Sequence, residues 1–501
     1  MKKDIKRSLL KNSVWIFLLS LVNKIGSLIF IMILTRFLMP EKFGIYSITL
    51  SIAMIFLSIS DLGLNQVFTI YASSALSKNK KLIPSYHRYL FRIKLFSTLF
   101  ISLLLFFLSY PLSYYFFRNE NIFVPLLISS VYIFVFSFEG FYTSTFYIVE
   151  KFRYVFYKEF LNQFIKIILS ISVFYLISIN YYVIGIFSVF VINSILLLFF
   201  AIYYTKKFLP NLFDKPQLNI NKQRINKLIF YLSFISFFSI LFSYVDSVLL
   251  GFFLSSEYVG YYRAAISLII TIAGILSFPT GALLPAFSKE DSYNTQKIFN
   301  RSFKYLMIIT IPASFGIAIL GKYFMKLIFG NSFLQASSIL YFLSLQLIPL
   351  VGANIFGPIF SAKEKINITT KLVVLTSIIN LILNIILIKS FLFISPMFAT
   401  FGAAFASILS WYFYFGTGLF YLKKEFHFIP PKEYIIKPLL SSLLMSFVLI
   451  FLNTHIIKDM NLILGLSEVF LGAIIYFLTS FLIKSIKKED LMLFKLLFKN
   501  D

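Results

Sequence analysis

Apolar runs of about 20 residues recur along this chain, and they constrain its fold more than any other feature. As a helix, each run is long enough to cross a hydrocarbon core of ~30 Å. Hydrophobic residues make up 59% of the 501 residues and charged residues 13%, against roughly 45–50% and 25% in soluble domains. The sequence therefore predicts an all-α integral membrane protein.

We expect about 14 transmembrane helices, with the first apolar run retained as a permanent span because no small-residue cleavage site follows it. The predicted spans are residues 12–34, 44–68, 90–110, 122–149, 160–179, 182–204, 228–252, 259–286, 303–325, 337–360, 370–389, 397–421, 435–454 and 461–483.

The positive charges alternate between the two sides that these spans define. When residues near the end of a span are counted with the adjoining loop, 36 of the 46 Lys and Arg residues belong to the two termini and the even-numbered loops, seven to the odd-numbered loops, and three to the spans themselves. Short loops rich in Lys and Arg stay in the cytoplasm. Both termini are therefore expected to be cytoplasmic. The net charge of +26 follows this asymmetry and gives no reason to expect a nucleic-acid partner.

An internal repeat divides the chain. Residues 37–46 (FLMPEKFGIY) and 253–262 (FLSSEYVGYY) agree at five of ten positions with an offset of 216 residues, and each bridges the first two spans of its half. Six spans per half predict parallel repeats around a central cavity. The expected domains are a six-helix lobe (1–210), a cytoplasmic linker (211–227), a second six-helix lobe (228–430), and two additional helices with a basic tail (431–501).

The residues that usually bind metals or nucleotides are scarce. There is no cysteine, and the three histidines, His87, His427 and His455, are scattered near span ends. No glycine-rich phosphate loop with a lysine is found. We expect no metal and no cofactor.

Ordered motifs in both halves resemble the polysaccharide-export, or oligosaccharide-lipid flippase, family of the multidrug and oligosaccharide-lipid exporter superfamily. In the first half they are Thr35-Arg36, Leu38, Pro40, Phe43-Gly44-x-Tyr46 and Asp61-Leu62-Gly63-Leu64; in the second they are Asp246, Gly251, Glu257-x-x-Gly260-Tyr261-Tyr262, Pro279 and Pro285.

This resemblance implies a V-shaped two-lobed transporter, not an enzyme. It implies outward movement of a prenyl-linked oligosaccharide across the plasma membrane by alternating access, for cell-surface glycan synthesis. The expected partners are the lipid-linked oligosaccharide and membrane lipids, with polymerase or glycosyltransferase machinery as an open further partner.

Ionisable residues within spans are costly and normally face a cavity. Ser20, Lys24 and Ser27 share one face of the first span, and Lys24 is the first choice for a phosphate contact. The alternative is a structural lysine that pairs with a carboxylate or snorkels to the interface. Lys166 either pairs with Glu139, which we favour, or helps to admit the head group.

The remaining candidates concern gating, coupling and sugar contacts. Asp61 forms a helix-end hydrogen bond or takes part in ion coupling, and the former is favoured. Asp246 and Arg263 flank one exterior turn and are expected to pair, as a gate latch or as a structural pair. Arg263 is also a candidate head-group contact. Asn380 and Asn384 bind sugar hydroxyls or bond between helices, which is the commoner use of such residues.

Three other functions compete. An ion-coupled multidrug or small-molecule exporter of the same superfamily would need an acidic cavity, and Lys24 argues against cationic drugs. A membrane-embedded glycan polymerase or glycosyltransferase would need a larger loop with catalytic groups. A non-transporting scaffold would not need charges at mid-membrane depth.

The predicted orientation can be tested directly because the chain has no cysteine. Glu120→Cys should react with a membrane-impermeant maleimide on intact cells, and Asp214→Cys only after permeabilisation. The reverse pattern would contradict cytoplasmic termini.

Overall fold

The computed structural model describes residues 2–216, 218–277, 283, 287, 292–455, 462–486 and 490, without the side chains of residues 2–13, 292 and 462. No strand occurs in these ranges. The motif residues Pro279 and Pro285, the end of the predicted span 259–286 and most of the basic tail lie outside the described residues.

Thirteen helical segments in this part of the chain are long and apolar enough to cross a membrane. The first, Val14–Lys78, has 65 residues and would be about 100 Å long as one helix, three times the core thickness. It contains the predicted span 44–68 and residues 14–34 of the predicted span 12–34. The chain is therefore a multi-pass, all-α membrane protein, as the apolar runs predict.

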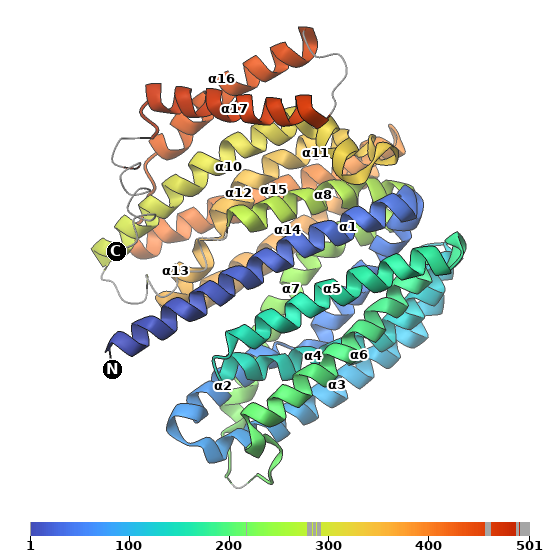
Figure 1. The fold of residues 1–501 in the computed structure, drawn as a ribbon, viewed down its shortest axis with the longest axis vertical. Coiled ribbons are helices and arrows are strands. Elements are labelled where there is room, and N and C mark those ends of the chain that lie inside the picture. The colour runs from blue at the N-terminus through green and yellow to red at the C-terminus, as the bar shows by residue number, and fades with distance from the viewer. Residues whose placement is uncertain are drawn as a thin grey trace. The chain divides into compact units, whose positions relative to one another are not determined.

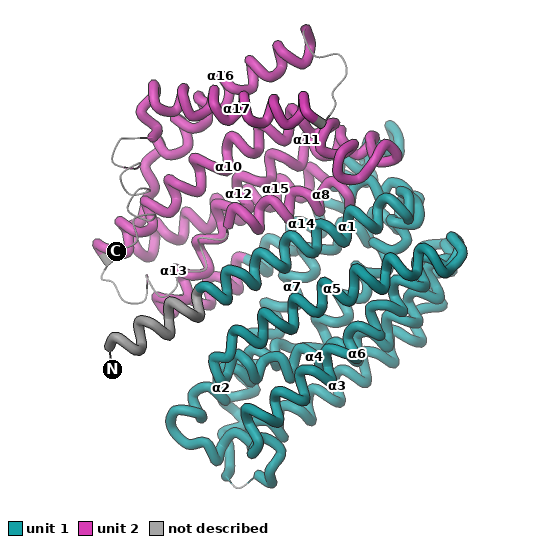
Figure 2. Tube along the Cα trace, viewed as in Figure 1, with its two compact units in different colours: residues 1–263, 373–403 teal, residues 264–372, 404–501 magenta. Residues whose placement is uncertain are grey.

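The described chain forms two compact units (Figure 2). Unit 1 comprises residues 1–263 and 373–403, and unit 2 comprises residues 264–372 and 404–501. The division at residues 211–227, expected from the repeat, stays a prediction.

Unit 1 is built on seven helices and parts of three others. The seven are α1 (Lys2–Asp61), α2 (Leu64–Lys78), α3 (Ile83–Pro111), α4 (Phe123–Ile148), α5 (Phe152–Leu176), α6 (Tyr182–Phe208) and α7 (Lys222–Phe253), and the three are α8 (Ser256–Leu276), α14 (Ile366–Leu392) and α15 (Pro396–Phe426). Helices α3, α4, α6 and α5 run side by side (Figure 1). The buried core where α2, α3 and α4 meet is mainly aliphatic, and within it Phe68 of α2 stacks on Phe141 of α4 at 4.9 Å between ring centroids.

Among the described residues, unit 2 contains the rest of α8, α14 and α15 and six further helices. They are α10 (Ser292–Phe329), α11 (Ala336–Leu343), α12 (Leu347–Ala353), α13 (Phe356–Ala362), α16 (Glu433–His455) and α17 (Leu462–Leu482). The additional helices α16 and α17 pack on each other and on α10 (Figure 1).

The predicted span 337–360 is not one continuous helix. It consists of α11, α12 and α13, and Pro349 and Pro358 lie within the two short helices, where a proline removes a backbone donor. The backbone carbonyl groups between α11 and α12 accept hydrogen bonds from side chains. Ser314 donates to the Ser344 oxygen at 2.7 Å and Tyr412 to the Leu345 oxygen at 3.3 Å. Irregular backbone at membrane depth is tolerated where protein surrounds it.

The two repeat segments contact each other reciprocally within unit 1. A Cβ atom on Gly44 would lie 1.7 Å from the Ser256 oxygen, and one on Gly260 would lie 2.1 Å from the Pro40 oxygen. Pro40 and Ser256 are equivalent at the 216-residue offset, and so are Gly44 and Gly260. Such a reciprocal contact is what a two-fold repeat produces. At the same place Met39 interrupts α1 with φ 59° and ψ 170°.

Replacing Gly44 should therefore destabilise the protein. In Gly44→Ala the added methyl group overlaps backbone rather than a flexible side chain, and we expect a loss of ~1–3 kcal/mol or more in the free energy of unfolding. Gly416→Ala in α15 is the control, because no atom lies within 4 Å of its Cβ position. Unfolding in detergent micelles measures both, and equal stability of the two variants would contradict the reciprocal packing.

Candidate functional site

All ten residues predicted to form the site lie in unit 1. Most of them belong to three buried polar clusters or to one half-buried helix face, whereas Lys166 and Arg263 lie over aromatic rings. Among the described residues no group of three His, Cys, Asp or Glu side chains is placed to hold a metal ion.

The half-buried face lies on α1. Ser20, Lys24 and Ser27 are each partly exposed there, as the spacing of four and three residues predicts. Within the described part of the chain, no hydrogen bond or ion pair is formed by Lys24. An ammonium group in an apolar helix with no carboxylate beside it is suited to binding an anion that arrives from outside the protein.

The first buried cluster joins α4 and α5, and it corrects the predicted pairing. Glu139 pairs with Lys158 at 2.7 Å, not with Lys166, and the Lys158 side chain also lies 3.7 Å from Glu159. Lys166 instead lies over the ring of Phe30 on α1, 4.5 Å from its centroid, as a cation–π contact. The error arose from the helix boundary. With the span starting at residue 160, Lys158 belonged to a loop, whereas α5 begins at Phe152.

Amide side chains extend this cluster to α6 and α1. Asn162 donates to Glu159 at 2.7 Å and Asn193 of α6 donates to Asn162 at 2.6 Å. Gln163 donates to Asn23 of α1 at 3.4 Å, beside the α1 face that carries Lys24. This chain of amides was not predicted from the sequence, although the spacing of Asn162 and Gln163 at three and four residues from Glu159 is visible there.

The second cluster lies where α1 ends. Asp61 is bonded to Lys94 of α3, whose side chain is fully buried, and the Lys94 ammonium also lies 3.3 Å from the Asn65 oxygen on α2. Asn65 in turn lines a cavity of about 540 Å³ with Gln66 and Ser144. Lys94 was missed because it was counted among the cytoplasmic charges. Its spacing of four residues to Thr98 and again to Ser102 could have revealed it as part of a polar stripe.

The third cluster centres on Asp246 of α7. Its carboxylate accepts hydrogen bonds from the Tyr262 hydroxyl at 2.6 Å and from Asn384 of α14 at 2.7 Å. Asn384 therefore makes the interhelical bond that was the alternative to a sugar contact. Asn380, one turn away and fully buried, has neither side-chain polar atom bonded within the described residues.

The predicted pair between Asp246 and Arg263 is wrong for the residues described. The Arg263 guanidinium lies over the ring of Tyr244 at 4.9 Å and has no ion pair there. Tyr262 and Arg263 are neighbours on α8, so they point about 100° apart. It is Tyr262 that faces Asp246.

Breaking one buried pair should cost more than removing both of its members. Lys158→Met leaves the Glu139 carboxylate buried without its cation, which typically costs about 3–5 kcal/mol, whereas an apolar replacement of the whole pair is often neutral. We expect Lys158→Met to be destabilised and Glu139→Met/Lys158→Met to recover most of the loss in free energy of unfolding.

Lys166→Met is the control on the same helix, because Lys166 forms no ion pair in the described chain. Chemical unfolding in micelles compares the three variants. If the double variant is as unstable as Lys158→Met, the pair is not the source of the loss.

Several known proteins are similar to this chain. A family model described as polysaccharide biosynthesis protein matches residues 9–291. The probable low-salt glycan biosynthesis flippase Agl15 of Haloferax volcanii is 29% identical over 163 residues, which cover 32% of this chain and 34% of the relative. The probable lipid II flippase MurJ of Rickettsia prowazekii is 26% identical over 273 residues, covering 48% of this chain and 52% of the relative. The chain thus covers from a third to about half the length of these relatives.

Two solved structures share the fold. One is a lipid II flippase MurJ in an inward closed conformation, with a TM-score of 0.72 and 19% identity over 94% of this chain and 98% of the other. The other is an inward-facing multidrug resistance transporter, with a TM-score of 0.63 and 13% identity over 81% and 95%. These relatives are named as flippases and transporters, not as enzymes. The family model covers more than half of the residues of this chain, and the chain therefore belongs to the polysaccharide biosynthesis protein family.

Proposed function

We propose that this protein is a flippase that moves a prenyl-(pyro)phosphate-linked oligosaccharide from the cytoplasmic to the outer leaflet of the plasma membrane. The observation that carries the proposal is Lys24, a half-buried cation without an ion pair among the described residues, on an apolar helix of a protein from this family. The names of the glycan and lipid II flippases among its relatives support it.

The head group is the part of such a substrate that opposes crossing. Its phosphate charge and sugar hydroxyls lose water in the hydrocarbon core, whereas the prenyl tail does not need to leave the lipid. Lys24 would meet the phosphate, and Ser20 and Ser27 on the same face would offer hydroxyl groups. Lys166 and Arg263 are further candidates, because both lie on aromatic rings that compete weakly with a phosphate.

Movement by alternating access requires contacts that form and break. Asp61, Glu139 and Asp246 are the candidates for gating or coupling, because each is a carboxylate held by a few bonds within an apolar helix bundle. Asn380, whose side-chain amide has no partner among the described residues, remains a candidate for a sugar contact, whereas the Asn384 amide already donates to Asp246. A glycan polymerase or glycosyltransferase would be the natural partner, since it consumes the flipped product.

An ion-coupled exporter of small molecules is the competing function, since a multidrug transporter shares the fold. Lys24 favours an anionic substrate over the cationic compounds that such an exporter would need an acidic cavity to bind.

Transport in liposomes distinguishes the two functions. We expect the wild-type protein to move a prenyl-diphosphate oligosaccharide, Lys24→Ala to reduce the rate at least about tenfold through loss of a charge-assisted contact, and Lys24→Arg to restore much of it. Lys389→Ala removes an exposed lysine from α14 and should transport normally.

The readout is the fraction of substrate that an enzyme added outside the liposomes can reach. Equal rates in wild type and Lys24→Ala would remove Lys24 from the path. Absence of movement by wild type with several glycans and with ion gradients applied would favour the small-molecule exporter.

A further inference from the structure

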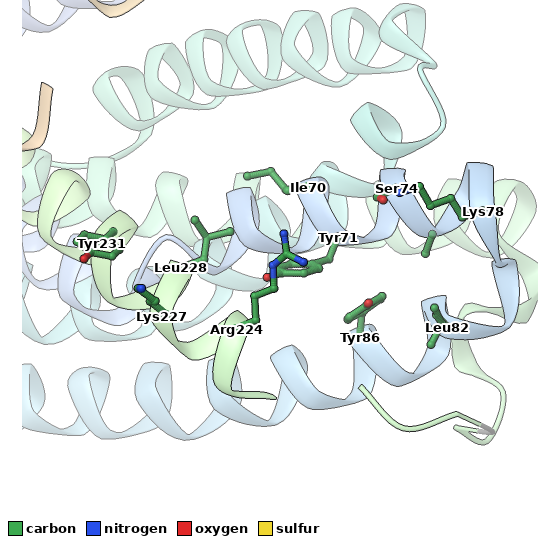
Figure 3. Close-up of a pocket in the computed structure, with 11 residues that line it drawn as sticks. Ile70, Tyr71, Ser74, Lys78, Leu82, Tyr86, Arg224, Lys227, Leu228 and Tyr231 are labelled. Atoms are coloured by element: carbon green, nitrogen blue, oxygen red, sulfur yellow. The ribbon is translucent and has the colours of Figure 1, made fainter. Parts of the chain in front are cut away.

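A basic cavity in unit 1 lies apart from the residues considered so far. It has a volume of about 570 Å³ and is formed by the end of α2, the start of α3 and the first turns of α7 (Figure 3). That volume lies in the range of roughly 300–1,000 Å³ that is usual for small-molecule sites. Neither Lys24, Lys166 nor Arg263 lines it.

Three cations line the cavity: Lys78, Arg224 and Lys227. No carboxylate does, and none of the three forms an ion pair with a described residue. Arg224 and Lys227 stand in the first two turns of α7, where the partial positive charge of a helix start adds to theirs. Three like charges around one hollow favour a multiply charged anion as the occupant.

Tyrosine rings form much of the remaining wall. Tyr71 of α2 and Tyr86 of α3 are 5.3 Å apart between ring centroids, and Tyr231 of α7 is 46% exposed. Figure 3 shows Arg224 extending from α7 towards Tyr71, with Tyr86 beside them. Tyrosine offers an apolar face together with a hydroxyl group, which suits a sugar ring with its C–H face and its hydroxyls.

We propose that this cavity binds the sugar-diphosphate head group of the substrate before transport. The inference rests on the proposed function and adds a second head-group site to it. Arg224 and Lys227 hold the diphosphate, and the tyrosines contact the first sugar. Arg224 and Lys227 lie at the end of the basic linker, which the charge distribution assigns to the cytoplasm. The cavity would therefore bind the head group on the cytoplasmic side, before it is moved across the membrane.

The shared chemistry, a phosphate group, could also come from an anionic phospholipid or from free phosphate. The tyrosine walls and the volume favour a sugar next to the phosphates, since a phosphate ion alone would fill a small part of the cavity. The test therefore compares these sources.

Binding is measured with the full-length protein in phosphatidylcholine nanodiscs. The probe is a farnesyl-diphosphate-linked N-acetylglucosamine, and calorimetry gives its Kd. We expect Arg224→Gln/Lys227→Gln to weaken binding at least about tenfold, because two charge-assisted contacts are lost. Tyr231→Ala should weaken binding of the glycolipid but not of inorganic pyrophosphate.

The matched control is Lys206→Gln/Lys222→Gln. It also removes two positive charges from the same side of unit 1. Its two lysines lie over the rings of Phe213 and Tyr89 and do not line the cavity. Its Kd should stay within about twofold of the wild-type value. Arg224 and Lys227 are exposed, and thermal unfolding verifies that all variants are folded.

Three results would overturn the inference: equal weakening in both double variants, pyrophosphate binding as tightly as the glycolipid, or displacement of the probe by phosphatidylglycerol. The second would indicate a free-phosphate site and the third a phospholipid site.

Transport assays on the same preparations separate this inference from the proposed function. Wild type that binds the probe in this cavity but moves no glycolipid would refute the flippase and keep the site. Wild type that moves glycolipid, with Arg224→Gln/Lys227→Gln binding and transporting equally well, would refute the site and keep the flippase.

Discussion

The contact between the two repeat segments is the constraint on which much of unit 1 depends. Gly44 and Gly260 allow backbone to approach backbone, since any side chain there would overlap a carbonyl oxygen. Helix α8 is thereby fixed beside α1 at its first turn, and Asn119 adds a 3.0 Å bond to Ser256. Two residues past Gly260, Tyr262 then meets Asp246. The close contact between the two repeat segments thus positions Tyr262, a hydrogen-bond partner of the buried Asp246 carboxylate.

Charge burial follows a consistent pattern in this bundle. Asp61 has Lys94, Glu139 has Lys158, and Asp246 has Tyr262 and Asn384. A buried ion left alone would cost several kcal/mol, so these arrangements are the minimum that an apolar bundle requires. Lys24 differs, because its ammonium meets no carboxylate in the described chain. Lys166 and Arg263 share this lack of an ion pair among the described residues, and for that reason we propose all three cations, Lys24 first, as head-group contacts.

The sequence was informative where the physical signal is periodic or cumulative. Apolar length located the spans, and the shared face of Ser20, Lys24 and Ser27 followed from helical spacing. Pairing was harder to predict, because it depends on where a helix begins and on the direction of each side chain. Starting α5 at residue 160 hid Lys158, and the choice between Tyr262 and Arg263 required a rotation of about 100° that no spacing rule supplies. The break at Pro349 was visible in the sequence. The side chains that donate to the freed carbonyl groups, Ser314 and Tyr412, were not.

A transported anion must be bound tightly enough to enter and weakly enough to leave, as in any selective pathway. The cations of this protein are graded in that respect. Arg224 and Lys227 are exposed and water-screened, so the contact with a diphosphate that we propose for them would be modest. Lys24 is half-buried in an apolar helix, where a charge contact is stronger. A head group that passes from the first set to the second would exchange hydration for a stronger electrostatic contact. The free-energy cost of dehydrating the head group would then be offset by this contact inside the membrane, where dehydration is most complete.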